Sequence, residues 1–289
     1  MSEALKQAMY ERELSVAIEL ARASGATALA FYGRPMKVEH KGNEPVTQAD
    51  RAVNELIVKG LKRDFPEDGI LAEESVDTAR RLDCARVWMV DPLDGTKGFI
   101  AGSGDFAVQI GLAVDGRSVL GVVYAPATDV LYWAAEGSGA WVERPELERE
   151  RLRVSETRDV ARMRLAASRS HRSQRMDRVV RALGIEEEVQ RHSVGIKVGL
   201  IVERQCDLYI HLSAGTKQWD TCAPEAVIRE AGGLLTDLWG EPLRYNTPDV
   251  YNRNGLLASN AAAHAHVVEL VRPLLDEFGR ERVSDNYSN

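Results

Sequence analysis

The spacing of apolar residues predicts two helices and two short strands in the first ninety residues. Residues 4–32 repeat apolar side chains every three to four positions and stop before a glycine and a proline, as an amphipathic helix does. The same spacing predicts a second helix over about residues 50–64. Short apolar runs at 70–71 and 87–90 have the length of strands, and acidic residues follow both of them directly.

The middle of the chain changes to a β pattern. Apolar runs at 106–114 and 118–124 flank Asp115-Gly116, which is a strong signal for a hairpin turn. Runs at 130–135 and 140–142 flank a Gly-Ser-Gly turn in the same way. These four runs therefore predict two antiparallel hairpins.

The charged segment 145–153 is poor in apolar residues and is the predicted connector between two units. The first unit, residues 1–150, is expected to be an α+β domain, and the second, residues 151–289, an α/β domain in which strands and helices alternate. The elements predicted in the second unit are strands at 163–167, 208–212 and 255–258, and helices at 173–183, 194–203, 223–231 and 261–278.

Composition and charge limit the classes of function. The 289 residues are 44% hydrophobic and 28% charged, enough to bury a core in one large domain or two ordinary ones. With no run of about 18 apolar residues and no apolar signal stretch at the N-terminus, we expect no membrane partner. Three scattered cysteines favour a reducing, cytoplasmic compartment and argue against a zinc site. The net charge of −7 disfavours nucleic-acid binding and suits a site that collects divalent cations.

Two carboxylates stand three residues apart in the segment Asp91-Pro92-Leu93-Asp94-Gly95-Thr96. Because Pro92 stiffens the backbone, Asp91 and Asp94 are expected to aim at one point, with the Leu93 carbonyl between them. Oxygen donors of this kind suit Mg²⁺, and backbone N–H groups in the Gly-Thr turn could face a phosphate. Taken alone the motif is weak, since Asp-Pro and Asp-Gly are ordinary turn formers.

Acidic residues at other element ends strengthen the interpretation. Asp50 begins a predicted helix, where the alternative is a cap of the backbone N–H groups. Glu73-Glu74 follows a strand, where the alternative is a solvated pair, although adjacent like charges repel unless a cation offsets them. Asp220 also has the alternative of a helix cap. Each alternative is sound singly, but the joint occurrence favours metal-assisted phosphate chemistry.

In their order, these motifs resemble the lithium-sensitive, Mg²⁺-dependent phosphatase superfamily typified by inositol monophosphatase. The matching segments are 45–50, 72–75, 91–96 and 219–220, so the similarity spans nearly the whole chain. The resemblance implies an α/β fold layered as an αβαβα five-layer sandwich. It also implies that metal ions are bound by the side chains of Glu73, Asp91, Asp94 and Asp220 and by the Leu93 carbonyl.

The resemblance further implies that Thr96 pairs with Asp50 to orient the nucleophilic water. The chemistry suits these residue types, because two or three Mg²⁺ ions can lower the pKa of a bound water and clamp the attacking and leaving oxygens of a phosphate ester. A hydrogen-bond acceptor such as Asp50 keeps the Thr96 hydroxyl in register. No His or Cys nucleophile is required.

Within the superfamily, segments 96–99, 168–171, 193–197 and 217–226 resemble the 3′(2′),5′-bisphosphate nucleotidases, which remove the 3′-phosphate of 3′-phosphoadenosine 5′-phosphate. A second phosphate needs additional cations. The loop 100–105 departs from these relatives, which leaves the fine substrate preference open. The predicted substrate contacts are Gly95, Thr96, Lys97, Ser168, Arg169, His171 and Lys197, and the alternative for each cation is a position on the open surface.

The predicted function is therefore Mg²⁺-dependent hydrolysis of adenosine 3′,5′-bisphosphate to AMP and phosphate, in sulfur metabolism, by a monomer or homodimer. The nearest alternative is a phosphatase of inositol monophosphate or another sugar phosphate. A further alternative, an inactive nucleotide- or metal-binding protein on this fold, is disfavoured because Thr96 is present and each matched ligand position keeps an acid. The remaining histidines, at positions 40, 192, 211, 264 and 266, have no metal-ligand spacing and are predicted to be structural.

Overall fold

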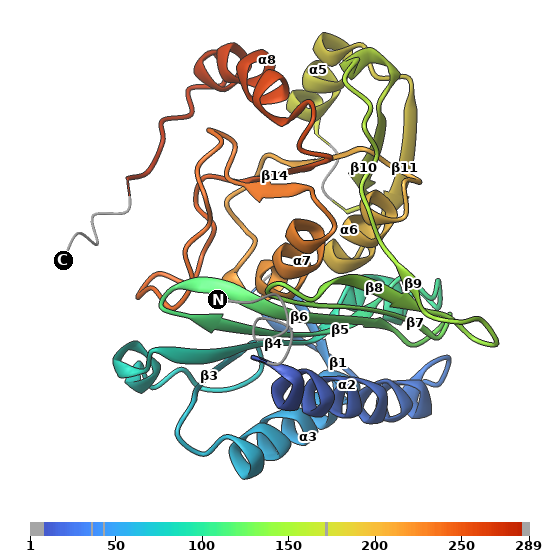
Figure 1. Ribbon diagram of the computed structural model, residues 1–289, viewed down its shortest axis with the longest axis vertical. Coiled ribbons are helices and arrows are strands. Elements are labelled where there is room, and N and C mark those ends of the chain that lie inside the picture. Colours follow the sequence, from blue (N-terminus) through green and yellow to red (C-terminus); the bar gives the residue numbers. More distant parts are fainter. Residues whose placement is uncertain (1–8, 36, 43, 171–172, 285–289) are drawn as a thin grey trace.

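The computed structural model describes residues 9–35, 37–42, 44–170 and 173–284, and they form five layers (Figure 1). Helices α2 (Glu11–Phe31) and α3 (Gln48–Asp64) lie under a large sheet. Helices α6 (Val194–Val202) and α7 (Gln218–Glu230) lie between this sheet and a smaller one, and α5 (Gln174–Leu183) and α8 (His264–Glu277) cover the smaller sheet from above. The expected αβαβα sandwich is confirmed.

The large sheet is antiparallel except at one edge, where β3 and β4 run parallel. Parallel strands end at the same edge of a sheet, so the residues that follow β3 lie beside those at the end of β4. In the described part of the chain this sheet has seven strands, in the order β3 (Gly69–Ala72), β4 (Arg86–Asp94), β5 (Ala107–Val114), β6 (Arg117–Ala125), β7 (Val130–Ala135), β8 (Gly139–Glu143) and β9 (Glu150–Arg151).

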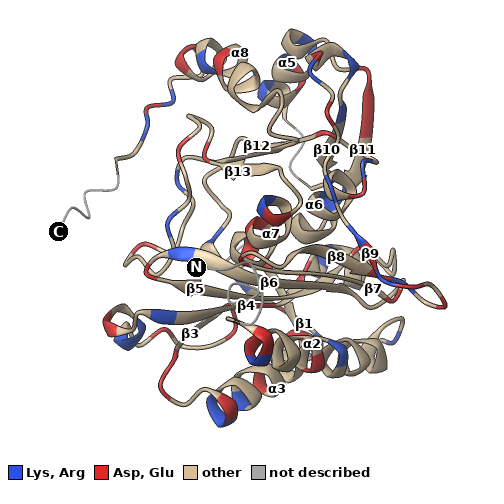
Figure 2. Ribbon diagram, viewed as in Figure 1, with Lys and Arg blue, Asp and Glu red and all other residues tan. Residues whose placement is uncertain are grey.

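The small sheet is mixed. Strand β10 pairs in parallel with β11 and β12, and β14 pairs antiparallel with β12 and β13. Among the described residues its five strands are, in spatial order, β11 (Glu187–Arg191), β10 (Arg164–Ser168), β12 (Leu208–His211), β14 (Leu256–Ser259) and β13 (Leu234–Thr236). Apolar side chains fill the space between all adjacent layers. In Figure 2 the strands of the large sheet are mostly uncharged, whereas the outer helices α3 and α8 carry both signs of charge.

Helix α7 lies unusually close to the large sheet because two glycines face it. Gly111 on β5 and Gly121 on β6 are cross-strand partners. A Cβ on Gly111 would lie 2.8 Å from the backbone nitrogen of Ala223, and a Cβ on Gly121 would overlap the carbonyl group of the same residue. The Ser118 hydroxyl donates a hydrogen bond to the Cys222 carbonyl at 2.7 Å. The backbone of α7 therefore rests directly on the backbone of the sheet.

Most predicted elements are present, and the differences have local causes. Helix α7 begins at Gln218 rather than 223, with Pro224 inside it, because the Asp220 carboxylate accepts the Lys217 N–H at 2.7 Å and caps an earlier start. Helix α8 begins at His264 rather than 261. The elements without a sequence signal are short or polar: the antiparallel strands β1 (Val38–Lys41) and β2 (Glu44–Thr47), β9, β11, β13, α4 (Thr96–Ile100), and the 3₁₀ turns Arg80–Asp83 and Val160–Arg162.

The two-unit division at residue 150 stays a prediction. The large sheet uses residues 69–151 and the small sheet residues 164–259, but α7 packs against strands of the large sheet. Helix α2 is long and apolar enough to pass a length-and-composition test for a membrane span. It packs against α3 and the large sheet, and Ala17, Ala21 and Ala28 are fully buried there, as in a core helix.

Candidate active site

A β-bulge turns both carboxylates of the Asp-Pro-Leu-Asp segment to one side. Asp91 pairs with Gln109 of β5, whereas Asp94 pairs with Ala107, so three steps along β4 match two steps along β5. Residues three apart on a regular strand point to opposite faces, and the one extra residue cancels this alternation. Strand β4 thus continues to Asp94, beyond the strand expected over residues 87–90, and Asp91 and Asp94 line the same pocket.

Two more acidic residues line this pocket from neighbouring elements. Glu73 follows β3 and is held beside β4 by a 3.1 Å hydrogen bond from its N–H to the Val90 carbonyl. Asp220 lies in the first turn of α7, which packs against β4. The structure therefore brings together the four side chains that the sequence assigned to metal ions, from the ends of β3, β4 and α7.

The pKa values of these carboxyl groups are raised by burial and by one another. Burial and then the charge of Asp220 raise the pKa of Glu73 to about 8. Burial and then Asp94 raise the pKa of Asp220 to about 7. The pKa of Asp91 is raised well above its ordinary value by burial, followed by the charges of Glu73, Asp94 and Asp220. Four mutually repelling carboxylates of this kind are stabilised by a cation between them.

The donor set fits hard divalent cations such as Mg²⁺, which take carboxylate and carbonyl oxygens as ligands. The side chains do not yet form a closed cage: in the described part of the chain no three Asp, Glu, His or Cys side chains are close enough together to hold an ion. The Leu93 carbonyl lies at the same pocket, and its oxygen is 3.1 Å from the hydroxyl oxygen of Thr96. The chemistry of the donors, carboxylates and a carbonyl, thus fits a metal site.

Asp94 also anchors the N-terminus of α6. Its Oδ2 accepts hydrogen bonds from the Ser193 hydroxyl at 2.5 Å and the Gly195 N–H at 2.8 Å, and its Oδ1 accepts the Val194 N–H at 3.1 Å. Gln109 donates to Oδ2 at 2.5 Å. A carboxylate at a helix N-terminus is stabilised by the unpaired N–H groups there. Asp94 therefore joins the bulge of β4 to the second half of the chain.

Asp50 and Thr96 are in direct contact. The Thr96 hydroxyl donates to Asp50 Oδ1 at 3.1 Å, and Asp50 Oδ2 accepts the N–H and hydroxyl of Thr47 at 2.7 and 2.5 Å. The pKa of Asp50 is raised by burial, and the hydrogen bonds from Thr47 and Thr96 partly oppose that effect. The carboxylate thus caps α3 with one oxygen and holds Thr96 with the other. Gly95 supports this turn with a positive φ of 94°, which favours glycine.

The pocket that contains the four acidic side chains is called the main pocket below. Of the predicted substrate contacts, Gly95, Thr96, Lys97, Ser168 and Lys197 line it. Lys97 is exposed, whereas Lys197 is only 1% exposed. The ammonium of Lys197 donates to the carbonyl of His192 at 3.1 Å and lies 4.7 Å from the ring centre of Tyr209. Burial lowers the pKa of Lys197 to about 8, with Asp94, Asp105 and Asp220 opposing the shift.

Arg169 does not line the main pocket. It is exposed and lines a neighbouring cavity with Arg144 and Arg191. Arg144 is paired there with Glu203 at 3.1 Å, and the Arg169 side chain has no hydrogen-bond or ion-pair partner among the described residues. His171 lies outside the residues that the structure describes.

Two histidines that were predicted to be structural, His192 and His211, also line this pocket. His192 precedes α6, and its Nδ1 is 2.8 Å from the Ser170 hydroxyl. His211 ends β12, and its Nε2 is 2.6 Å from the Ser213 hydroxyl. The end of a predicted strand was a usable signal for His211, since pockets of α/β folds form at strand ends. Nothing in the local sequence marks His192.

Lys217 was also missed. Its ammonium donates to Glu44 at 2.5 Å and lies 3.9 Å from Glu73, so it neutralises part of the negative charge of the acidic side chains. Burial lowers the pKa of Lys217, but the hydrogen bond to Glu44 and the charges of Asp220 and Glu73 outweigh it, and the net shift is upward.

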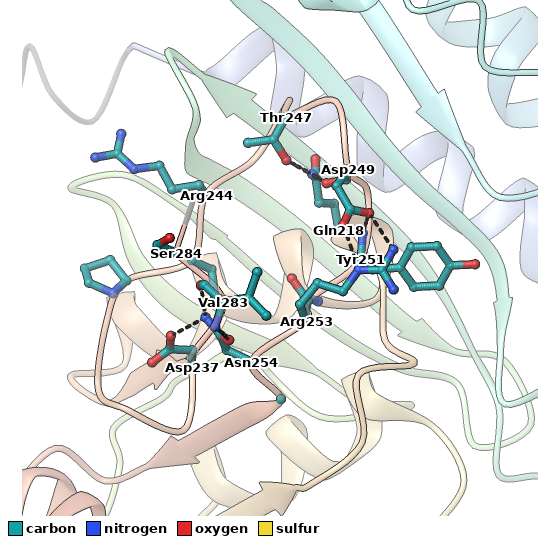
Figure 3. A pocket seen from close by; sticks show the side chains of 14 residues that line it. Gln218, Asp237, Arg244, Thr247, Asp249, Tyr251, Arg253, Asn254, Val283 and Ser284 are labelled. Carbon is teal, nitrogen blue, oxygen red and sulfur yellow. Dashed lines mark hydrogen bonds and ion pairs between the residues drawn. The ribbon is translucent and has the colours of Figure 1, made fainter. Parts of the chain in front are cut away.

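A second pocket, near the start of α7, is lined by polar groups that already bond to one another (Figure 3). Gln218 donates to the Thr247 hydroxyl at 2.6 Å, and Arg253 is paired with Asp249 at 2.7 Å. Asn254 donates to Asp237 at 3.1 Å. These partners satisfy one another, so the acidic pocket is the better candidate for chemistry.

Comparison with known proteins shows the family to which the chain belongs. A model of the inositol monophosphatase family matches residues 9–275. The chain belongs to this family. It is 38% identical over 83% of its length, and 97% of the relative's, to the 3′(2′),5′-bisphosphate nucleotidase CysQ of Escherichia coli K12. It is 29% identical to a fructose-1,6-bisphosphatase/inositol-1-monophosphatase of Thermotoga maritima, over 92% of this chain and 98% of that one.

The fold is similar to that of family members of known structure. The crystal structure of CysQ from Bacteroides thetaiotaomicron has a TM-score of 0.74 and 33% identity, covering 87% of this chain and 98% of that one. Membership in the family and the relatives' identity over most of the chain support phosphatase activity. The resemblance inferred from the motifs is thereby confirmed, and this family member is an enzyme.

Proposed function

We propose that this phosphatase is a Mg²⁺-dependent 3′(2′),5′-bisphosphate nucleotidase that hydrolyses 3′-phosphoadenosine 5′-phosphate to AMP and phosphate. The observation that carries the proposal is one pocket lined both by acidic side chains and by the buried side chain of Lys197. A substrate with two phosphates suits such a pocket, since one phosphate can bind at the acidic side chains through metal ions and the other at a cation. The nucleotidase relatives support the same substrate class.

Glu73, Asp91, Asp94 and Asp220, with the Leu93 carbonyl, would hold two to three Mg²⁺ ions. When bound, these ions would lower the pKa of a water molecule and neutralise charge on the phosphoryl oxygens. The raised pKa values of Glu73 and Asp220 mean that the metal-free pocket retains protons near neutral pH. Metal binding is therefore expected to release protons.

Thr96 and Asp50 would orient the attacking water. The Thr96 hydroxyl donates a hydrogen bond to Asp50. The lone pairs of the Thr96 oxygen therefore remain available to accept a hydrogen bond from that water. Asp50 is fixed by Thr47, so its own position does not depend on the substrate. Thr96 and Asp50 would therefore hold the attacking water in place, and no His or Cys side chain is needed as the nucleophile.

Lys197 would bind the second phosphate, with Lys97 and Ser168 at the edge of the pocket. Backbone N–H groups of Gly95 and Thr96 would face the reacting phosphate. Arg169 would act from the adjacent cavity, and His171 stays a proposed contact outside the described residues. We place the enzyme in the cytoplasm, acting on a small phosphate ester as a monomer or homodimer.

Phosphate release from adenosine 3′,5′-bisphosphate, adenosine 3′-monophosphate and inositol monophosphate tests the proposal. We expect kcat/KM to be highest for the bisphosphate, and activity to vanish with EDTA and return with Mg²⁺. Faster hydrolysis of inositol monophosphate would favour the second candidate, a sugar-phosphate phosphatase. The similarity to the Thermotoga maritima relative is the observation that favours that candidate.

A further inference from the structure

We propose that Asp105 is a positioning residue for the ammonium group of Lys197, and that it thereby sets the preference for a second phosphate. The proposal rests on the function proposed above, in which Lys197 binds that phosphate. Asp105 lies between α4 and β5 and is 7% exposed. Neither the sequence motifs nor the metal chemistry uses it.

The link between the two residues passes through the backbone of His192. Asp105 Oδ2 accepts the His192 N–H at 2.6 Å, and the His192 carbonyl accepts the Lys197 ammonium at 3.1 Å. His192 thus links the two side chains, because its N–H is held by the Asp105 carboxylate and its carbonyl holds the Lys197 ammonium. A shift of Asp105 would move the acceptor that fixes Lys197.

Asp105 is itself fixed against the turn that carries the catalytic groups. Its backbone carbonyl packs on Gly95 and Gly98, so closely that a Cβ on Gly95 would lie 2.7 Å from the carbonyl oxygen. This turn contains Asp94 and Thr96. Asp105 therefore contacts both the turn where the reacting phosphate would bind and the peptide that holds the ammonium of Lys197.

The negative charge of Asp105 has an effect beyond that of its hydrogen bond to His192. Its second oxygen, Oδ1, is buried and has no hydrogen-bond partner among the residues that the structure describes. A buried, half-bonded carboxylate is costly unless a cation is near. Lys197 is one such cation, because the charge of Asp105 is among those that oppose the effect of burial on the pKa of Lys197, and Arg144, Arg169 and Arg191 line a cavity with Asp105. Asp105 thus favours the charged form of the phosphate-binding group.

The test compares Asp105→Asn with the parent enzyme. Asparagine keeps an oxygen for the His192 N–H but removes the charge. We expect the ratio of kcat/KM for adenosine 3′,5′-bisphosphate to that for adenosine 3′-monophosphate to fall about 10-fold, mainly through KM for the bisphosphate. Lys197→Met should lower the same ratio, and the double variant should lose little more, because both changes act on one contact.

Asp129→Asn is the matched control. Asp129 also accepts a hydrogen bond, from the Tyr124 hydroxyl at 2.8 Å, but does not line the main pocket. We expect this variant to keep the parent's ratio, and far-UV circular dichroism shows whether each variant is folded. If Asp105→Asn does not fold, Asp105→Glu provides the second variant, since it keeps the charge and misplaces it, and the same fall in the ratio is expected.

The outcomes separate the two proposals. A parent enzyme without preference for the bisphosphate would overturn the proposed function. A parent with that preference, a reduced ratio in Lys197→Met and an unchanged ratio in Asp105→Asn would overturn the role of Asp105 alone. Equal losses on both substrates in Asp105→Asn, or losses that add to those of Lys197→Met, would also overturn it.

Discussion

The hydroxyl of Thr96 lies 3.1 Å from the carboxylate of Asp50, a residue 46 positions earlier in the chain. The contact joins the start of α3 to the start of α4, and a second oxygen of the same carboxylate is held by Thr47. Helix capping and the orientation of Thr96 are therefore not alternatives, because one side chain does both.

Thr96→Ala is expected to lower kcat by about 100-fold or more and to change KM little, because the hydroxyl orients the water rather than the substrate. Thr96→Ser keeps the hydroxyl and should retain most of the activity. Steady-state kinetics on the bisphosphate at saturating Mg²⁺ measure both. An effect of Thr96→Ala on KM alone would place the residue among the substrate-binding groups.

Asp91→Asn and Asp94→Asn are expected to differ in stability although both abolish turnover. Asp91→Asn removes one of the repelling buried charges, so the metal-free protein should unfold at the same or a higher temperature. Asp94→Asn places an amide NH₂ against the donors of Gln109, Ser193 and α6, which costs about 1–3 kcal/mol and lowers Tm by a few degrees. Thermal unfolding in EDTA measures the difference. Equal Tm values for the two variants would contradict the anchoring role of Asp94.

Bisphosphate preference is expected to depend on Lys197 and on pH. Because the pKa of Lys197 is lowered to about 8, its ammonium is charged below that pH and loses its proton as the pH rises through it. The kcat/KM ratio of bisphosphate to monophosphate should therefore fall above pH 8 in the parent. In Lys197→Met the ratio should be low and flat with pH. A ratio that rises with pH in the parent would exclude this lysine as the phosphate contact.

The buried side chain of His264 is expected to make the folded protein less stable in acid. Burial lowers its pKa to about 4, and its ring nitrogens are 2.7 Å from the Ser259 hydroxyl and 2.9 Å from that of Thr236. The unfolded chain binds a proton near pH 6.5 and the folded chain only near 4, so folding is favoured above pH 6.5 and loses stability as the pH falls toward 4. Urea unfolding of the parent and of His264→Gln between pH 7 and 4.5 should show a weaker pH dependence in the variant.

Local signals in the sequence predicted most helices and strands and the acidic residues at their ends, and the family resemblance of the motifs supplied the five layers and the expected ligand set. The cap at Thr47, the spacing of the strands and each acidic motif can be recognised from a few neighbouring residues. The bulge at Asp91–Asp94 was not readable, since it depends on the register with β5. The direction of Arg169 and the approach of His192 to the pocket depend on how two sheets and α6 pack, and no local pattern records that packing.

The glycine pair under α7 has a consequence for how this enzyme can diverge. Asp220 lies in the first turn of α7, and the backbone of this helix rests on the backbone of the sheet at Gly111 and Gly121. A single added methyl group at either glycine would push α7 away from the sheet and separate Asp220 from the acids of β4, while leaving every proposed ligand intact. The enzyme can thus be inactivated by a substitution that changes none of its acidic residues.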